Sequence, residues 1–221
     1  MRERESAMAK EMNYHDELNK KNVLKLRKIL EPLPSFCRQF FRGIEDTTAT
    51  RTRIAYAYDL RVFFEFIHKT NGVYRNTDIV DFPLSILDQI GREDIEEYME
   101  YLSYYVKDGV EYMNDERGKK RKLASLRSFY NYFYRNELIS TNPAVLVPLP
   151  KLHEKEIVRM EPNEVAVLLD EVEDGSGLTK KEMSYHQKNG TRDLALLTLL
   201  LGTGIRVSEC VGLDLNDVDF D

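Results

Sequence analysis

Apolar side chains recur at intervals of three and four residues through most of the chain, which is the period of an amphipathic helix. Tyr56, Leu60, Phe63 and Ile67 form one such stripe. No convincing strand-like alternation precedes the C-terminal end, so we predict a mainly α protein. Helices are predicted over about 14–30, 36–44, 50–69, 92–106 (closed by Asp108-Gly109), 119–137, 162–173 and 193–201.

Three prolines interrupt this period in the middle of the chain. No helical pattern survives across Pro143, Pro148 and Pro150, and this indicates a linker between two domains. The predicted layout is a charged N-terminal helical extension over 1–31, a helical domain over 32–142, a linker over 143–160 and a second domain over 161–221.

Local signals describe the second domain further. Pro162 suits the first position of a helix, whereas the polar stretch from Asp174 to Gly190 is predicted to be an exposed loop. Thr191 is predicted to cap the helix over 193–201. Residues 214–220 alternate between polar and apolar, which favours entry into a strand.

The composition is that of an ordinary globular protein, with 42% apolar and 32% charged residues among 221. The strongly apolar run from Leu194 to Leu201 is too short to cross a bilayer, and the charged N-terminus does not resemble a secretory signal. Cys37 and Cys210 lie far apart, in settings that suit reduced thiols. We therefore expect a cytoplasmic protein with no membrane partner.

The net charge of −6 hides an uneven distribution. Residues 79–111 contain nine acids and two bases, whereas residues 118–136 contain six bases and no acid. A phosphate backbone responds to the local field of such a segment and not to the mean charge of the chain. Net acidity therefore does not exclude a nucleic-acid partner.

The basic segment has two faces when it is drawn as a helix. Its apolar side chains fall on one arc, while Lys120, Arg121, Ser125 and Asn131 fall on the opposite one. The bases also crowd the predicted first turn, where the helix dipole disfavours cations, so an anion from a partner would be stabilising there. The alternative is a solvated basic face that binds nothing.

Positive charge combined with small hydrogen-bonding groups is the mixture that contacts DNA backbone and base edges. A second, weaker group of candidates stands at the start of the 50–69 helix, beside Tyr56, whose main role is expected to be packing. The candidate DNA-binding residues are Arg51, Thr52, Arg53, Lys119, Lys120, Arg121, Lys122, Ser125, Arg127 and Asn131.

Ordered motifs extend this picture, and together they resemble the tyrosine recombinase (phage integrase) family, most nearly its Xer-type members. Each motif alone is weak, but their order and spacing over about 33–221 make the resemblance specific. The matching residues are Thr52, Tyr56, Asp59 and Leu60; Asp94, Ile95 and Tyr98; Leu126 to Tyr130; Asn142-Pro143; and Thr203, Gly204, Arg206, Ser208 and Glu209.

The resemblance implies a SAM-like four-helix core-binding domain, followed by the helical start of an α+β catalytic domain. It also implies strand exchange at a DNA recombination site through a 3′-phosphotyrosyl intermediate, with no metal or cofactor, by protomers that act as tetramers. Arg206 matches the arginine that grips the scissile phosphate, and its planar fork suits that role. Glu209, one helical turn on, would support Arg206; a purely structural salt bridge between the two is the alternative.

The sequence departs from the family pattern after Arg206. The family's lysine, its His-x-x-Arg pair, its later His or Trp and its nucleophilic tyrosine follow this arginine in relatives, whereas all thirteen tyrosines here precede it. We therefore expect a recombinase fragment that binds DNA without cleaving it and is monomeric in isolation. A stand-alone, non-catalytic DNA-binding protein and a helical protein-interaction module are the alternatives.

Overall fold

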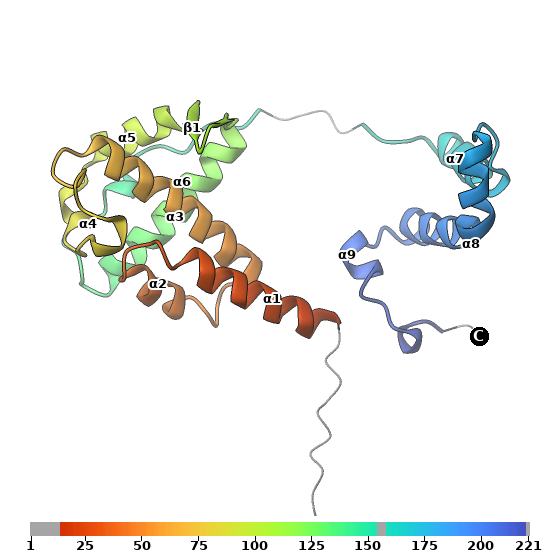
Figure 1. The fold of residues 1–221 in the computed structure, drawn as a ribbon, viewed down its shortest axis with the longest axis horizontal. Coiled ribbons are helices and arrows are strands. Elements are labelled where there is room, and N and C mark those ends of the chain that lie inside the picture. Colours follow the sequence, from red (N-terminus) through yellow and green to blue (C-terminus); the bar gives the residue numbers. More distant parts are fainter. Residues whose placement is uncertain (1–13, 154–157, 220–221) are drawn as a thin grey trace, which may run out of the picture. The chain divides into compact units, whose positions relative to one another are not determined.

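The computed structural model describes residues 14–153 and 158–219 (Figure 1). The chain divides into two units, residues 1–153 and 154–221, and each is considered by itself. The prediction of a mainly α protein is confirmed, since a two-stranded hairpin is the only sheet among the described residues. No helix in these ranges is long and apolar enough to cross a membrane.

The first unit contains six α-helices within its described part. In chain order its elements are α1 (Tyr14–Ile29), α2 (Cys37–Gly43), α3 (Thr50–Thr70), a 3-10 turn η1 (Ile79–Asp81), α4 (Ile86–Gln89), α5 (Arg92–Tyr101), β1 (Tyr105–Lys107), β2 (Val110–Tyr112), α6 (Glu116–Arg135) and a second 3-10 turn η2 (Pro143–Val145).

The core of this unit lies where α2, α3 and α6 meet. The ring of Phe129, on α6, is fully buried and lies 5.0–6.2 Å, centroid to centroid, from the rings of Phe36, Phe40, Phe64 and Phe133. Most of these pairs meet edge to face, which is a favourable aromatic geometry. The apolar arcs predicted for the two long helices therefore pack against each other.

Helix α6 begins three residues before its predicted start. The Asp115 carboxylate caps it by accepting a hydrogen bond from the Gly118 backbone N–H at 2.8 Å, and Glu116 adds an acid to the first turn. The bases from Lys119 to Lys122 therefore lie at the end of the first turn and in the second. The predicted conflict with the helix dipole is correspondingly weaker, because the effect fades beyond the first turn.

The prediction of a helix over 92–106 was wrong at its C-terminal end. Helix α5 ends at Tyr101, and β1 pairs antiparallel with β2, with Tyr105 opposite Tyr112. Asp108 and Gly109 have φ angles of 51° and 76°, which is the left-handed backbone of a type I′ hairpin turn. An Asp-Gly pair between β-branched and aromatic residues was the signal for this hairpin.

The second unit contains α7 (Pro162–Asp174), α8 (Lys180–Thr203), α9 (Val207–Cys210) and a 3-10 turn η3 (Leu215–Asp217). Pro162 occupies the start of α7, as predicted. The predicted loop over 174–190 was wrong beyond Thr179, because α8 begins at Lys180 and runs through Thr191 without a break.

Helix α8 is capped by Thr179 and not by Thr191. The Glu182 backbone N–H donates to Thr179 Oγ1 at 3.4 Å, while the Glu182 carboxylate accepts from the Thr179 backbone N–H at 2.9 Å. This reciprocal capping box nucleates the polar first half of the helix, which no apolar stripe marks. The predicted strand over 214–220 was also wrong in its described part, where Asp217 accepts from the Asp214 backbone N–H and closes η3; residue 220 lies outside the described residues.

Candidate nucleic-acid interface

One buried carboxylate, that of Asp59, joins α3 to α6. Asp59 is 2% exposed, and its Oδ2 accepts hydrogen bonds from Arg121 Nη1 at 2.6 Å and from Ser125 Oγ at 2.7 Å. Its Oδ1 accepts from Lys122 Nζ at 3.3 Å. A charge removed from water in this way is tolerated only when it is paired and hydrogen-bonded. These contacts therefore fix the basic turn of α6, residues 119–122, against α3.

The two bases on Asp59 differ in their access to solvent. The side chain of Lys122 is 9% exposed, whereas that of Arg121 is 48% exposed. Because a guanidinium carries five N–H donors, Arg121 can bind Asp59 and still present donors to an outside anion. From the sequence, an anion from a partner was expected to stabilise these bases. The carboxylate of Asp59, from within the protein, already provides one such anion.

Several predicted DNA-binding residues are engaged within the fold. Ser125 is fully buried, so its placement on the solvent arc was wrong: that side of α6 packs against α3. Lys119 Nζ donates to Ser103 Oγ at 2.5 Å. Arg53 is buried, and its Nη1 donates to Glu45 Oε1 at 2.9 Å.

Arg127 holds the chain that follows the helical bundle. Its Nε donates to the Ala144 carbonyl at 3.1 Å, and its Nη2 donates to the Val147 carbonyl at 2.6 Å. Asp88 assists nearby by accepting from the backbone N–H groups of Ser140 and Thr141. The Arg127 guanidinium therefore organises the segment leaving the first unit.

The solvent face of α6 carries a stripe of polar residues, interrupted once by Ala124. Its members follow one another at alternating intervals of four and three residues, which places them on one face of the helix. These residues are Arg117, Arg121, Ala124, Ser128, Asn131 and Arg135, of which Ser128 is half-buried and the others are exposed. Arg117 was missed in the sequence analysis because the helix was predicted to begin after it.

Two further candidates are exposed at the start of α3. Arg51 and Thr52 both face solvent, and within the described residues neither has a side-chain hydrogen bond or ion pair. Lys120, on α6, is half-buried and is likewise unpaired in that part of the chain. The first unit thus presents Arg51, Thr52, Arg121 and Asn131 to solvent, and the half-buried Lys120 in part, on two helices that pack against each other.

Arg206, in the second unit, stands immediately after α8. The helix ends at Gly204, whose φ of 68° requires the left-handed backbone that glycine adopts readily. Arg206 then serves as the N-terminal cap residue of α9, and its side chain is 81% exposed. The turn therefore presents a guanidinium to solvent at the end of a long helix.

Glu209 holds Arg206 through both its backbone and its side chain. Glu209 Oε2 accepts from the Arg206 backbone N–H at 2.9 Å, and Oε1 accepts from Nη1 at 3.0 Å. These contacts, the backbone hydrogen bond first, lower the pKa of the Glu209 carboxyl below its ordinary value. Because only one terminal nitrogen is engaged, the remaining guanidinium donors can reach an oxyanion.

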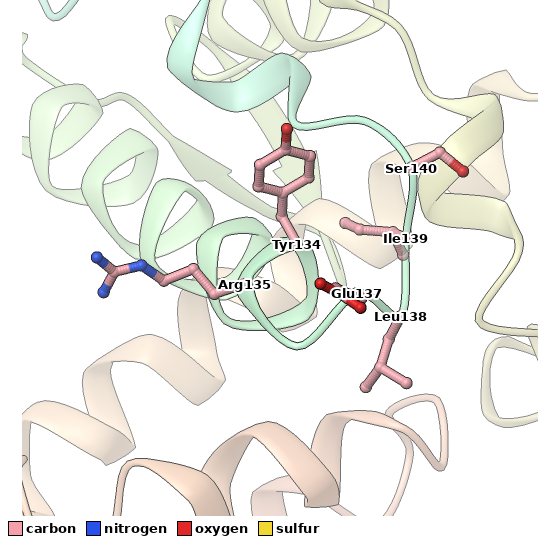
Figure 2. Close-up of a pocket in the computed structure, with 6 residues that line it drawn as sticks. All are labelled: Tyr134, Arg135, Glu137, Leu138, Ile139 and Ser140. Carbon is pink, nitrogen blue, oxygen red and sulfur yellow. The ribbon is translucent and has the colours of Figure 1, made fainter.

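A surface hollow at the C-terminal end of α6 does not have the character of a chemical site. It encloses about 430 Å³ and is lined by residues 134–140 except Asn136. In Figure 2 the side chains of Arg135, Leu138 and Ser140 project in different directions and do not converge on a common point. Among the described residues, no three His, Cys, Asp or Glu side chains are grouped so as to hold a metal ion.

Both units are similar in sequence to known proteins. Residues 158–221 match the model of the phage integrase family. The tyrosine recombinase XerC of Caldanaerobacter subterraneus subsp. tengcongensis is 33% identical over 174 residues, which cover 76% of this chain and 44% of that protein. This alignment is longer than the second unit, so the similarity extends into the first.

Residues 158–221 belong to the phage integrase family. The XerC of Lacticaseibacillus casei is 31% identical over 193 residues (86% of this chain and 54% of the relative), and that of Bacillus subtilis is 44% identical over 99 residues (45% and 29%). The chain spans about half the length of the relatives that it matches along most of its length. No solved structure gives a significant match.

Proposed function

We propose that these 221 residues are the part of a site-specific tyrosine recombinase that grips duplex DNA, through the exposed basic surface of α3 and α6. The observation that carries this proposal is the anchoring of Arg121 by Asp59, which fixes a half-exposed guanidinium within the stripe on the solvent face of α6. Prepositioned bases bind phosphates without a further ordering cost, and their neighbours Asn131 and Ser128 have the hydrogen-bonding groups for base edges.

The predicted contact residues divide into two roles under this proposal. Arg51, Thr52, Lys120, Arg121 and Asn131 are exposed enough to touch DNA. Arg53, Lys122, Ser125 and Arg127 act indirectly, because their polar groups are engaged within the fold. Lys119 has both roles, because it donates a hydrogen bond to Ser103 and is still exposed enough to contact DNA.

In the second unit we propose that Arg206 binds the scissile phosphate. Its exposure supports this role, because Glu209 engages only one of its terminal nitrogens and the other donors are accessible to an oxyanion. Glu209 orients it. In the recombinase as a whole, a tyrosine would attack the phosphodiester, form a 3′-phosphotyrosyl bond and release a 5′-hydroxyl, which later attacks the partner strand.

The proposed partners follow from this activity. They are a duplex recombination site and further recombinase protomers assembled on it, and the proposed location is the cytoplasm. For the domain layout we propose an N-terminal extension over 1–31, a core-binding domain over 32–142, a linker over 143–160 and a catalytic portion over 161–221. The alternative, a DNA-binding protein without catalysis, shares the α3–α6 surface and differs only in the role of Arg206.

Salt-dependent DNA binding tests the proposal. The 221-residue protein is titrated into a labelled 40-base-pair duplex at several salt concentrations, in parallel with Arg117→Gln/Lys120→Gln. The double variant should bind more weakly, and the slope of log K against log [salt] should fall by about 1 to 2, because up to two phosphate contacts are lost. Lys69→Gln/Arg75→Gln, which removes two exposed bases near the other end of α3, serves as the control and should bind like wild type.

Two outcomes would overturn the proposal: no binding at low salt, or equal losses for the two variant pairs. A suicide duplex, in which the cleaved strand cannot be religated, separates the proposed function from catalysis by this chain. We expect binding without a covalent adduct, because none of its tyrosines follows Arg206.

A further inference from the structure

Helix α1 carries a dense positive charge that the motifs do not account for. From residue 18 to residue 30 it contains no acid, and it bears five exposed bases. These are Lys20, Lys21, Lys25, Arg27 and Lys28. Lys21 has one long contact, 4.0 Å to Glu17, and within the described residues the other four have no ion pair.

Helix α1 packs against the rest of the first unit. Leu26 and Ile29 are buried in the core, and α1 runs alongside α3 (Figure 1). Near its start, Asn19 Oδ1 accepts a hydrogen bond from Thr50 Oγ1, on α3, at 2.8 Å. The positions of the five bases are therefore fixed relative to α3.

Two consecutive residues of α3, Tyr58 and Asp59, contact α1 and α6 respectively. Lys25 Nζ, on α1, lies 5.7 Å from the centre of the exposed Tyr58 ring. The next residue, Asp59, holds Arg121 of α6. Tyr58 follows Arg51 by seven residues and so lies on the same exposed face of α3, with α1 on one flank and α6 on the other.

We propose that α1 is a third basic element of the DNA interface and binds backbone phosphates of the same duplex that α3 and α6 contact. This inference rests on the proposed function. Lysine, a compact charge on a flexible stem, suits phosphate binding better than base reading, so α1 contributes affinity and salt dependence and little sequence preference. Lys21, Lys25 and Lys28, at intervals of four and three, form the stripe next to Tyr58.

The test compares Lys21→Gln/Lys25→Gln/Lys28→Gln with a control that removes three exposed bases elsewhere in the unit, Lys69→Gln/Arg75→Gln/Arg92→Gln. Both are titrated with the 40-base-pair duplex and probed by hydroxyl-radical footprinting. For the α1 variant the salt slope should fall by about 2 to 3, since each lost phosphate contact lowers it by about 0.9. Its footprint should lose protection at backbone positions that the α6 variant leaves protected.

Each outcome separates the two proposals. If the α1 variant binds like its control while Arg117→Gln/Lys120→Gln weakens binding, α1 is a solvated face and only this inference fails. If neither affects binding, the proposed function fails as well. Circular dichroism and urea unfolding check that each variant is folded; every substituted side chain is exposed except that of Lys120, which is half-buried.

Discussion

The carboxylate of Asp59 lies 2.6 Å from the guanidinium of Arg121, across the contact between α3 and α6. The same carboxylate neutralises the buried ammonium of Lys122. The charged surface and the core of the first unit therefore share one residue, and its loss should affect both stability and DNA binding.

Replacing Asp59 with Ala should lower the free energy of unfolding of the first unit by about 3–5 kcal/mol, because the Lys122 ammonium is left buried without a counter-charge. Urea unfolding measures this loss. Glu96→Gln breaks an equally short pair with Arg92 that is solvent-exposed, and should cost no more than about 1 kcal/mol. Equal costs for the two variants would show that the Asp59 network is not a buried charge cluster in solution.

Replacing Arg127 with Gln should loosen the chain that leaves the first unit. The substitution removes charge-assisted hydrogen bonds to the carbonyls of Ala144 and Val147, at an expected cost of about 1.5–3 kcal/mol. Amide hydrogen exchange over residues 143–150 should accelerate. Arg135→Gln, an exposed change on the same helix, should leave that exchange unchanged, and a matching acceleration there would argue against a specific anchor.

Two threonines of α8 should respond differently to replacement by Ala. Thr179→Ala removes the N-cap and should cost about 1 kcal/mol, with faster hydrogen exchange over residues 181–186. Thr191→Ala should be neutral or slightly stabilising, because Ala has the higher helix propensity at an interior, exposed position. A larger loss of stability in Thr191→Ala than in Thr179→Ala would indicate that the helix begins at Thr191 in solution.

Two buried tyrosines should make the first unit sensitive to alkali. Burial raises the pKa of the phenols of Tyr98 and Tyr130 above the ordinary value, with the Asp59 charge as a second cause at Tyr98. The pKa of each phenol is higher in the folded state than in the unfolded state. The stability that the two neutral phenols contribute is therefore fully present below about pH 10 and is lost as the pH rises from there toward the folded-state pKa. Each should lower the free energy of unfolding by up to about 1.4 kcal/mol per pH unit above pH 10.

Urea unfolding between pH 8 and pH 11.5 measures this alkaline slope, and Tyr98→Phe should reduce it. The variant should remain stable at pH 8, because the Tyr98 hydroxyl has no hydrogen-bond partner within the described residues. Tyr134→Phe changes an exposed ring and should leave the slope as it is. An unchanged slope in Tyr98→Phe would mean that this phenol ionises normally in the folded protein.

The helices with an apolar stripe could be predicted from the sequence, and elements held by local polar contacts could not. The stripe through Leu60 and Phe63 identified α3 to within one residue at its C-terminal end. The first half of α8 depends on the Thr179–Glu182 capping box, which leaves no apolar period. The hairpin depends on two left-handed residues, Asp108 and Gly109, whose pair was interpreted as a helix stop.

The candidate interface was predictable as a segment and not residue by residue. Its basic content and core-facing arc could be read from composition and period. Which bases remain free depends on partners distant in sequence: Asp59 is 62 residues from Arg121, and Val147 is 20 residues from Arg127. Such pairing is a property of the tertiary fold, so a helical wheel of α6 alone placed the buried Ser125 toward solvent.

Helix α8 is continuous, so a tilt at its N-terminal end displaces the residues at its C-terminal end. Its 24 residues extend about 36 Å at 1.5 Å per residue, with the Thr179 cap at one end and Arg206 just past the other. A tilt of about 5° at the capped end would displace the guanidinium by roughly 3 Å, which is the length of a hydrogen bond. The position of the Arg206 guanidinium would therefore be sensitive to contacts made around Tyr185 and His186, near the other end of the helix.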